Sequence, residues 1–385
     1  MDLSLSEEQL MIQKAAREFA QQQCLPGVIE RDEHQKVPKE QLLQLADLGF
    51  MGIMTATEYG GAGMDTISYV LAMEEISKVD SSVSVSVSVN NSLVCWGLEH
   101  YGNEAQKQKY LTPLAQGKKD GELYLGAFLL SEPEAGSDAT HQHTSAIDKG
   151  DHYVLNGVKN WITNGSTASV YLVMAQTDAS KGSRGINAFI VEKNTPGITV
   201  GPKENKMGIR GSDTHSLMFT DVKVPKENRI GEEGFGFKFA MKTLGGGRIG
   251  IASQALGIAQ GAFELALAYS KERKAFGKLI SQHQAIQFKL ADMATRIEAA
   301  RLLIYRAAWL KDQDLPCEKE GAQAKVFASE VAMWVTTEAV QVHGGYGYVK
   351  EYHVERLMRD AKITQIYEGT SEVQRIVISR ALLAD

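Results

Sequence analysis

The sharpest chemical signal in the sequence is a carboxylate in a glycine-containing turn near the carboxyl terminus. Glu368 lies in IYEGTSE (366–372), directly before Gly369, and Thr370 or Ser371 can cap the helix that follows. An acidic residue near a helix start also has a structural use, because it complements the helix dipole. A carboxylate beside apolar residues in such a turn can equally act as a general base. The turn by itself leaves both interpretations open.

A second signal is a cluster of glycines. Gly245, Gly247 and Gly250 match the spacing GxGxxG within LGGGRIG. That spacing indicates dinucleotide binding only where a strand precedes it in a βαβ unit. The preceding segment, 235–244, instead predicts a helix, and no parallel-sheet pattern surrounds it. We therefore expect the small residues to let Arg248 and its backbone approach another group closely.

Two further segments have a structural and a functional interpretation. SEPEAGSD (131–138) is either a connecting loop or a backbone cradle in which Ser131 and Ser137 supply donors. Trp161, in the strand-like KNWITNG (159–165), is either a core residue or a ring that stacks on a planar cofactor. Composition alone does not decide between these alternatives.

The sequence predicts no metal centre. His141 and His143 form an HxH pair in a polar turn without a third ligand nearby, so an exposed loop is expected there. Cys24, Cys95 and Cys317 are far apart and lack ligand spacing. Such sparse cysteines argue against a disulfide framework and favour a reducing compartment.

Charge and hydropathy exclude other classes of function. The formal net charge of -6 argues against nucleic acid as a partner. No run of 18 apolar residues occurs, so no membrane span is expected. The acidic start MDLSLSEEQLMIQ is unlike a secretion signal, which predicts a cytoplasmic protein, or a mitochondrial matrix protein if the chain is processed.

Helical patterns dominate the amino-terminal third of the chain. Ser6 and Gln9 have the spacing of a capping box, and Pro38 can open a second helix that Gly49 can end. The segment SVSVSVSV (82–89) alternates strictly and, by its period alone, predicts a half-buried strand. Its helical neighbourhood favours a helix.

The middle third is rich in short β-like runs, which are separated by turn residues without intervening helices. This spacing favours an antiparallel barrel or sandwich. The runs cover 124–130, 153–163, 170–176 and 188–191.

The carboxyl-terminal third carries two long apolar stripes that step by three or four residues, and these predict packed helices in a bundle. One stripe comprises Ile286, Leu290, Met293, Ile297, Ala300, Ile304 and Ala307; the other comprises Ala324, Ala328, Val331, Val335, Ala339 and Val342.

Taken together, the motifs make the chain resemble the acyl-CoA dehydrogenase family over essentially its whole length. Several long motifs in one order are far more specific than any single one, and the last looks closest to the short-chain, butyryl-type branch. The motifs are AFLLSEPEAGSDA (127–139), KNWITNG (159–165), KMGIRGSDTHSLMFTDVKVP (206–225), GGRIGIASQALGIAQGA (246–262), ERKAFGK (272–278), QAIQFKLADMA (284–294), QVHGGYGY (341–348) and RDAKITQIYEGTSEVQR (359–375).

The resemblance implies an all-α amino-terminal domain over 1–119, a middle antiparallel β-barrel domain over 120–232 and a carboxyl-terminal four-helix bundle over 233–385. It also implies that 82–89 is helical, and we adopt that expectation. The resemblance further implies that the protein is a homotetramer with one FAD per subunit. It also implies that the enzyme passes its electrons to electron-transfer flavoprotein. The implied reaction converts an acyl-CoA thioester, in this branch a short-chain one, to a trans-2-enoyl-CoA in fatty acid β-oxidation.

The resemblance also implies roles for individual residues. Glu368 is the catalytic base. Residues matching cofactor-contacting positions are Phe128, Leu130, Ser131, Trp161, Thr163, Arg273, Phe276, Gln284, Gln341, Gly345, Thr370 and Glu372. Those matching positions near the CoA thioester are Ser137, Gly245, Arg248, Tyr367 and Gly369. By similarity, Arg273 and Phe276 reach the cofactor of a neighbouring subunit.

The family chemistry accounts for the residue types. The base removes the α-proton while the β-hydrogen leaves as hydride to the flavin. The thioester oxygen is expected between a ribityl hydroxyl of the flavin and the backbone N–H of the base, an oxyanion-hole arrangement. Closure around the acyl chain is expected to raise the pKa of Glu368 by desolvation.

Two positions distinguish this chain within the family. Some branches carry the base immediately before the arginine that matches Arg248; here that residue is Gly247, which strengthens the case for Glu368. Close relatives often have Asp where this chain has Gly245, so a side-chain contact to the ligand is missing there and only backbone can replace it.

Other functions are compatible with this fold. One is a branched short-chain dehydrogenase or an oxidase-like enzyme that passes electrons to oxygen. Another is a non-catalytic flavoprotein or CoA-binding scaffold, against which Glu368 in its matching turn argues. Acyl chain length and the physiological acceptor are not fixed by the motifs, because each methylene contributes only about 1–3 kcal/mol of discrimination.

Overall fold

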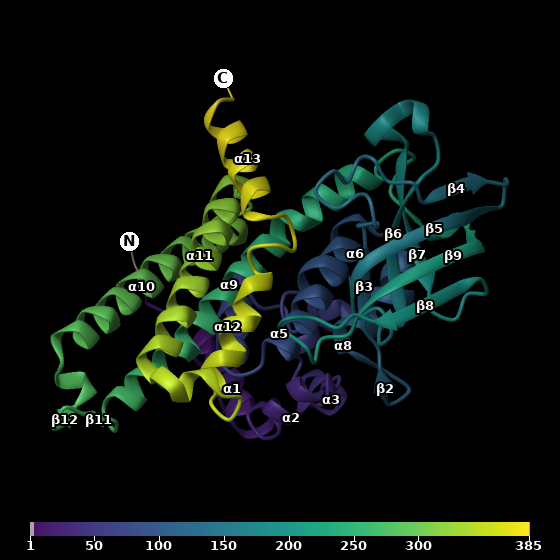
Figure 1. The fold of residues 1–385 in the computed structure, drawn as a ribbon. Coiled ribbons are helices and arrows are strands. Elements are labelled where there is room, and N and C mark those ends of the chain that lie inside the picture. Colours follow the sequence, from purple (N-terminus) through teal and green to yellow (C-terminus); the bar gives the residue numbers. More distant parts are fainter. Residues whose placement is uncertain (1–3, 385) are drawn as a thin grey trace.

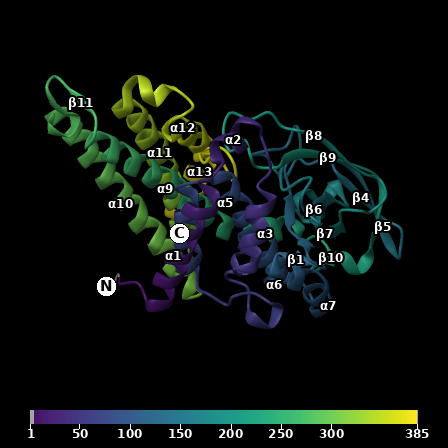
Figure 2. The same ribbon diagram turned by 90° about the horizontal axis from the view of Figure 1, so that it is seen from below.

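The computed structural model describes residues 4–384 and consists of amino-terminal helices, a β-domain and a carboxyl-terminal helical bundle. The β-domain and the bundle lie on opposite sides of the molecule (Figure 1). A view turned by 90° shows the amino-terminal helices α1, α3 and α5 beside both (Figure 2). This is the order of regions that the sequence predicts.

The amino-terminal helices begin and end at the predicted signals. Ser6 and Gln9 form the capping box, Pro38 precedes α3, and Gly49 follows it with a left-handed φ of 77°. The α-helices are α1 (Glu7–Phe19), α2 (Val28–Glu33), α3 (Lys39–Asp47), α4 (Thr66–Ser77), α5 (Ser81–Ser88), α6 (Trp96–Tyr101), α7 (Glu104–Gln106) and α8 (Thr112–Gln116). Short 3-10 turns, η2 (Phe50–Gly52) and η3 (Thr57–Tyr59), and π-helical turns, η1 (Ala20–Cys24), η4 (Val89–Cys95) and η5 (Lys107–Leu111), connect them.

The alternating serine–valine segment is helical, as the family resemblance implies and its period does not. Every residue of α5 is buried. The alternation of serine and valine therefore does not separate a solvent-exposed face from a buried one. Two of its serines bond within the helix: Ser84 Oγ donates to the Ser81 carbonyl at 3.2 Å, and Ser86 Oγ donates to the Ser82 carbonyl at 3.4 Å. Asp80 caps the helix by accepting from the backbone N–H of Ser82 at 3.0 Å. Tertiary burial therefore overrides the period.

The β-domain contains a mixed sheet in which antiparallel pairings dominate. Its strand order is β10-β7-β6-β4-β5-β9-β8, and β3 pairs with β6 in parallel. The strands are β3 (Gly126–Leu129), β4 (Ser145–Asp148), β5 (His152–Thr163), β6 (Val170–Gln176), β7 (Ile186–Glu192), β8 (Ile198–Lys203), β9 (Thr214–Pro225) and β10 (Arg229–Ile230); β1 (Lys118–Lys119) pairs with β2 (Glu122–Leu123) outside the sheet. Two 3-10 turns, η6 (Ala179–Gly185) and η7 (Lys226–Asn228), lie between strands.

Strand β6 shows how this sheet is held between two cores. Val170, Leu172 and Met174 pack toward the amino-terminal helices, whereas Tyr171 and Val173 pack inside the β-domain. Side chains alternate across a strand, so a strand that is buried on both faces is almost entirely apolar. Burial on both faces fixes the β-domain against the helices.

In the bundle the long helix α9 (Gly236–Ser270) packs against α10 (Gln284–Asp312), α11 (Glu318–His343) and α12 (His353–Ile363), and α13 (Ser371–Leu382) packs against α11. A hairpin, β11 (Lys274–Ala275) and β12 (Lys278–Leu279), joins α9 to α10 together with η8 (Ile280–Gln282); η9 (Gly344–Tyr348) follows α11. Both predicted apolar stripes lie in or against one core that also includes Val70 of α4. By length and composition α9 could cross a membrane, but 67% of its apolar window is buried inside the protein, as in a core helix.

Candidate active site

Glu368 lies in a left-handed turn between α12 and α13. Its φ is 51°, and that of Gly369 is 89°, a conformation that costs energy for a residue with a side chain. Thr370 caps α13 by accepting from the backbone N–H of Val373 at 3.3 Å, while Glu372 is exposed in the first helical turn. The turn is therefore a defined conformation at a capped helix.

Two buried side chains hold the carbonyls of this turn. Gln374 Nε2 donates to the carbonyls of Glu368, at 3.1 Å, and Gly369, at 2.9 Å. Lys325 Nζ, from α11, donates to the Gly369 carbonyl at 2.5 Å. Both side chains are 0% exposed. These bonds stabilise the strained backbone.

The carboxylate of Glu368 is desolvated and unpaired. The residue is half-buried, but its Oε2 is shielded from water and has no hydrogen-bond partner within residues 4–384. Burial raises the pKa of Glu368 to about 7, against the opposing charges of Lys325 and Arg248. A carboxylate with such a pKa can accept a proton near neutral pH, as a general base must.

The backbone N–H of Glu368 is free as well: within the described chain it makes no hydrogen bond. A free N–H next to a desolvated carboxylate provides a donor and a proton acceptor on the same residue. This pair is the arrangement expected for removing a proton beside a carbonyl while stabilising the developing oxyanion.

The Glu368 carboxylate closely approaches α9 at one of its glycines, Gly247. A Cβ placed at Gly247 would overlap Glu368 Oε2, and one at Gly246 would lie 2.8 Å from Lys311 Nζ. A Cβ at Gly245 would meet no atom within 4 Å. Close approach of another group is thus observed at Gly247 but not at position 245, which has room for a side chain that this chain lacks.

Arg248 is a buried cation without a partner. It is 8% exposed, its Nε has no hydrogen-bond partner, and no ion pair joins it to another residue of 4–384. Burial lowers its pKa, against the opposing charge of Glu368. Buried charged groups normally have partners, so Arg248 indicates a site for a polar ligand.

A polar plug, formed by Tyr367 and Gln254, lies on the other side of the turn. Tyr367 donates through its hydroxyl to Gln254 Oε1. Gln254 Nε2 in turn donates to the Ser81 carbonyl, at 3.0 Å, and to Ser84 Oγ, at 3.1 Å. The plug thus links the turn to α9 and α5 through polar groups.

A second group of predicted residues lies on the β-domain: Phe128, Leu130, Ser131, Trp161, Thr163 and Ser137. Trp161 is 60% exposed with a φ of 62°, where the pairing of β5 with β9 shifts register. Ser131 and Thr163 are partly exposed, and Ser137 is exposed. Trp161 is therefore not a core residue. Of the two interpretations of this residue, only the one in which its ring stacks on a planar cofactor is left.

A buried ion pair between Lys159 and Glu132 holds loop 131–138. Lys159, 0% exposed, donates to Glu132 Oε1 at 2.8 Å and to the Leu130 carbonyl at 3.1 Å. Glu132 also accepts from the backbone N–H groups of His143 and Thr144, at 2.5 and 3.0 Å. These contacts fix loop 131–138 against β5.

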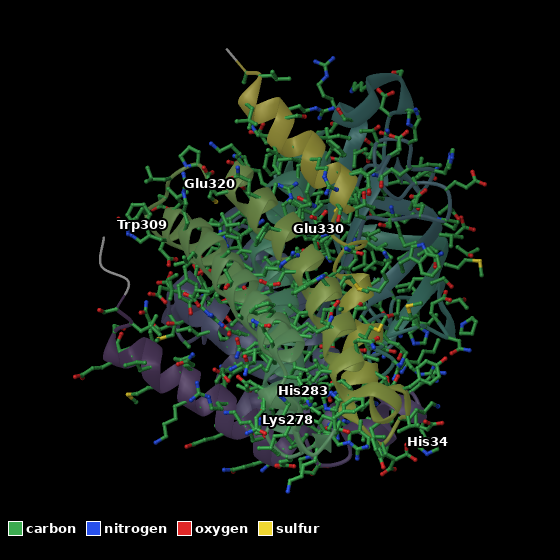
Figure 3. The ribbon with its side chains drawn as sticks, turned by 60° about the vertical axis from the view of Figure 1, so that its left-hand side comes forward. His34, Lys278, His283, Trp309, Glu320 and Glu330 are labelled. Atoms are coloured by element: carbon green, nitrogen blue, oxygen red, sulfur yellow. The ribbon has the colours of Figure 1, made fainter. Side chains whose placement is uncertain are left out.

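A third group lies at the far end of the bundle: Arg273, Phe276, Gln284, Gln341 and Gly345. Arg273 and Gly345 line a hollow of about 590 Å³ with Tyr269 and Tyr346, and Phe276 is 96% exposed. Lys278 and His283 mark this end of the bundle, opposite Trp309 and Glu320 (Figure 3). Gly247 and the end of α9 are about 35 Å apart at 1.5 Å per residue. One chain therefore does not bring this group to Glu368.

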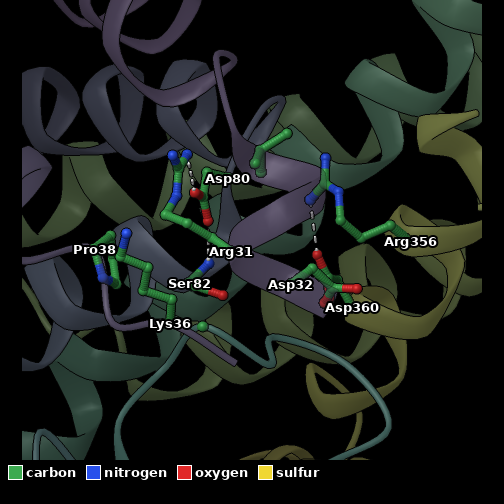
Figure 4. Close-up of a pocket in the computed structure, with 10 residues that line it drawn as sticks. Arg31, Asp32, Lys36, Pro38, Asp80, Ser82, Arg356 and Asp360 are labelled. Atoms are coloured by element: carbon green, nitrogen blue, oxygen red, sulfur yellow. Dashed lines mark hydrogen bonds and ion pairs between the residues drawn. The ribbon is translucent and has the colours of Figure 1, made fainter. Parts of the chain in front are cut away.

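A separate charged cluster joins the three parts of the chain (Figure 4). Arg31 pairs with Asp80 at 3.0 Å, and Arg356 pairs with Asp360 at 3.1 Å. Asp360 also accepts from the backbone N–H of Ile209 at 2.5 Å, and burial raises its pKa to about 6. These carboxylates have structural partners, unlike Glu368. No group of three potential metal ligands occurs in residues 4–384.

Sequence reasoning missed three side chains that contact the functional residues: Lys325, Gln254 and Gln374. Lys325 had a detectable signal. It is a lone lysine in the small-residue helix segment GAQAKVFASEVA, with Gly321 and Ser329 four residues away on either side. A charged residue on such a face requires a buried partner.

The geometry of the site defines a class of protein. A desolvated carboxylate, a free backbone donor beside it and an unpaired buried arginine on the neighbouring helix are features of an enzyme that abstracts a proton from a polar ligand.

Comparisons with known proteins supply the family. Models of the acyl-CoA dehydrogenase amino-terminal, middle and carboxyl-terminal domains match residues 6–118, 127–222 and 234–383. A short-chain specific acyl-CoA dehydrogenase of Clostridium acetobutylicum is 52% identical, over 98% of this chain and 99% of the relative. The chain belongs to the acyl-CoA dehydrogenase family and is a flavin-dependent oxidoreductase.

Solved structures agree with this assignment. The butyryl-CoA dehydrogenase of Megasphaera elsdenii is 52% identical with a TM-score of 0.97, and all of both chains is covered. A chain in a structure reported for the electron transferring flavoprotein of Acidaminococcus fermentans is 54% identical, also with a TM-score of 0.97 and full coverage of both chains.

Proposed function

We propose that this enzyme oxidises short, straight-chain acyl-CoA thioesters to trans-2-enoyl-CoA products, with Glu368 as the base. The observation that carries the proposal is the buried, unpaired Glu368 carboxylate, which lies against Gly247 of α9. A thioester α-proton is weakly acidic, so its removal needs a base of matched pKa and a donor for the oxygen. Glu368 has both in one residue.

The proton transfer follows from this arrangement. Glu368 Oε2 accepts the α-proton, and the free N–H of the same residue donates to the thioester oxygen as negative charge develops there. Arg248 and the backbone of Gly245 lie on the neighbouring helix face and are proposed to contact the polar part of the ligand, as is Ser137 from the β-domain. Gly369 permits the left-handed turn that presents the base.

The residues of the β-domain fit the flavin that the family implies. An indole that is 60% exposed on a strand offers a face for a planar ring. The ion pair of Lys159 with Glu132 holds the neighbouring loop 131–138 in place, so its donors are preorganised. An exposed ring beside a fixed polar loop is what a flavin ring system requires of its binding surface.

Residues from two parts of the chain are proposed to hold the flavin within one subunit. They are Phe128, Leu130, Ser131, Trp161 and Thr163 on the β-domain, with Thr370 and Glu372 at the start of α13. Bound flavin supplies the acceptor for the β-hydrogen, which leaves the substrate as hydride.

The polar plug supports a short acyl chain. Gln254 fills the space beside Tyr367, and it is bonded to Ser81 and Ser84. A long alkyl chain that extended past Gly250 toward these groups would leave their hydrogen bonds unmade, which costs free energy. A short chain ends before it meets them.

The far group supports a homo-oligomer, which we propose to be a tetramer. Arg273 and Phe276 follow the end of α9, which lies about 35 Å from Gly247, too far to act at the Glu368 of the same chain. The ring of Phe276 is 96% exposed and is therefore available to a neighbouring subunit. A second copy would place Arg273, Phe276, Gln284, Gln341 and Gly345 against its neighbour's flavin. Electron-transfer flavoprotein is the proposed acceptor, in line with the similarity to a chain reported with such a protein.

An anaerobic titration with butyryl-CoA tests the proposed function. The purified yellow protein is expected to lose its flavin absorbance on addition of butyryl-CoA, less readily with octanoyl-CoA and isobutyryl-CoA. A flavin band that persists with every acyl-CoA would contradict the proposal. Rapid reoxidation by air in place of electron-transfer flavoprotein would instead favour an oxidase-like enzyme.

A further inference from the structure

Lys325 is the buried cation nearest to the catalytic turn on α11. It is 0% exposed, yet it forms no ion pair within residues 4–384. Its one hydrogen bond joins Nζ to the Gly369 carbonyl at 2.5 Å. Burying an ammonium without a carboxylate partner is costly, and burial lowers the pKa of Lys325 to about 8. A structural lysine would be expected to have a closer anion.

The bond of Lys325 acts on the residue that follows the base. Glu368 and Gly369 both have left-handed φ values, 51° and 89°. The peptide that carries the Gly369 carbonyl therefore sets the direction of the turn, and Lys325 and Gln374 both donate to that oxygen. Only Lys325 brings a charge with its hydrogen bond.

We propose that Lys325 is a positioning residue for proton abstraction: it anchors the Gly369 carbonyl, which aims the Glu368 carboxylate, and its charge favours the ionised form of that base. This inference rests on the proposed function of Glu368. It assigns to Lys325 no contact with substrate or cofactor.

Other charged and titratable groups face the same carboxylate. Arg248 approaches from α9 and acts in the same direction as Lys325, while Tyr69 from α4 and Tyr367 from the turn interact with Glu368 electrostatically. Glu372 of α13 acts on Lys325. Removal of Lys325 would leave Arg248 as the single cation that opposes the desolvation of Glu368 among the described groups.

Three variants of the holoenzyme separate the hydrogen bond from the charge. Lys325→Met removes both, Lys325→Gln keeps a donor without the charge, and Gln374→Leu removes the neutral donor to the same carbonyl. Lys289→Met is the control, because Lys289 pairs with Glu338 near the other end of α11. Glu368→Gln identifies the infrared band of the Glu368 carboxyl.

The first measurement is a pH titration of that carboxyl by infrared difference spectroscopy, which needs no turnover. In Lys325→Met and Lys325→Gln the midpoint is expected to rise by about one pH unit, a tenfold change in the protonation equilibrium. In Gln374→Leu and Lys289→Met the midpoint should stay at the wild-type value. A wild-type midpoint in both Lys325 variants would overturn the proposal, and if Lys325→Met fails to fold, Lys325→Gln decides.

The second measurement is the pH profile of kcat with butyryl-CoA. Lys325→Gln is expected to shift the acid limb to higher pH with little change in KM, and Lys325→Met to lower the plateau as well. If the wild type does not turn over any acyl-CoA, the proposed function fails while the infrared titration still tests Lys325. Equal losses in kcat for the Lys325 and Lys289 variants, with no shift of the limb, would show a merely structural role.

Discussion

The Glu368 carboxylate occupies the space that a side chain at Gly247 would fill. A Cβ built at Gly247 overlaps Glu368 Oε2 and lies 2.8 Å from Leu93 Cδ2. The position immediately before Arg248 and the carboxylate of Glu368, the proposed base, thus converge on one point. A side chain at position 247 and the Glu368 carboxylate in its present place cannot both be accommodated.

Gly247→Ala is expected to lower kcat at least tenfold, because the added methyl displaces the carboxylate from its position. Gly245→Ala is the matched change two residues earlier, where a Cβ meets no atom within 4 Å. There, alanine should stabilise α9 by about 0.5–1 kcal/mol. Thermal unfolding and steady-state kinetics on both variants check this, and equal kcat losses at the two positions would contradict it.

Glu368→Gln should remove most of the turnover, by about 10²–10⁴-fold, because it keeps the shape of the side chain without its basicity. Binding of flavin and of an acyl-CoA should persist. Anaerobic mixing with butyryl-CoA, followed at the flavin band, measures the rate. Near wild-type bleaching would show that another group is the base.

The same substitution has a predictable effect on stability. Burial raises the pKa of Glu368 from 4.5 to about 7. Between these values the folded state binds a proton that the unfolded state has lost, so stability falls as pH rises through this window. Above pH 7 the unfavourable contribution is about 3 kcal/mol at most. Glu368→Gln should therefore be more stable than wild type at pH 8 and similar to it near pH 4.5, as thermal unfolding at both values will show.

The buried pair under loop 131–138 gives a prediction for cofactor retention. Lys159→Met leaves the Glu132 carboxylate buried without its cation, which should cost about 3–5 kcal/mol. The loop should loosen and flavin should dissociate more readily, as fluorescence of the released flavin will measure. Replacing both partners, Lys159→Met with Glu132→Leu, should recover part of the stability; a double variant worse than the single one would contradict this account.

Chain-length preference should respond to the polar plug. Gln254→Ala removes the side chain that Tyr367 donates to and opens space toward Ser84. The ratio of kcat/KM for hexanoyl-CoA to that for butyryl-CoA is expected to rise by about 10-fold, since one or two methylenes are involved. Gln260→Ala, farther along α9 and bonded to Glu264 of the same helix, serves as a control that should leave the ratio unchanged.

The sequence by itself determined the order of helices, β-domain and bundle, because periodicity and turn residues are local properties of the chain. It also singled out Glu368, Arg248 and Trp161 as candidate site residues, since their motifs are contiguous. The bundle stripes ending at Ala307 and Val342 are confirmed residue by residue, in or against a single core. A local pattern is enough to predict an element and its core residues where that element buries one face and exposes the other.

Only the tertiary structure decided which residues support the base. Lys325 bonds to a carbonyl 44 residues away, and Gln254 to a tyrosine 113 residues away. It also decided that 82–89 is helical. Because α5 is buried on every side, the alternation of serine and valine does not indicate one exposed and one buried face, as it would in a strand. Contacts between distant segments depend on how helices pack, and packing is a property of the whole chain that no local period encodes.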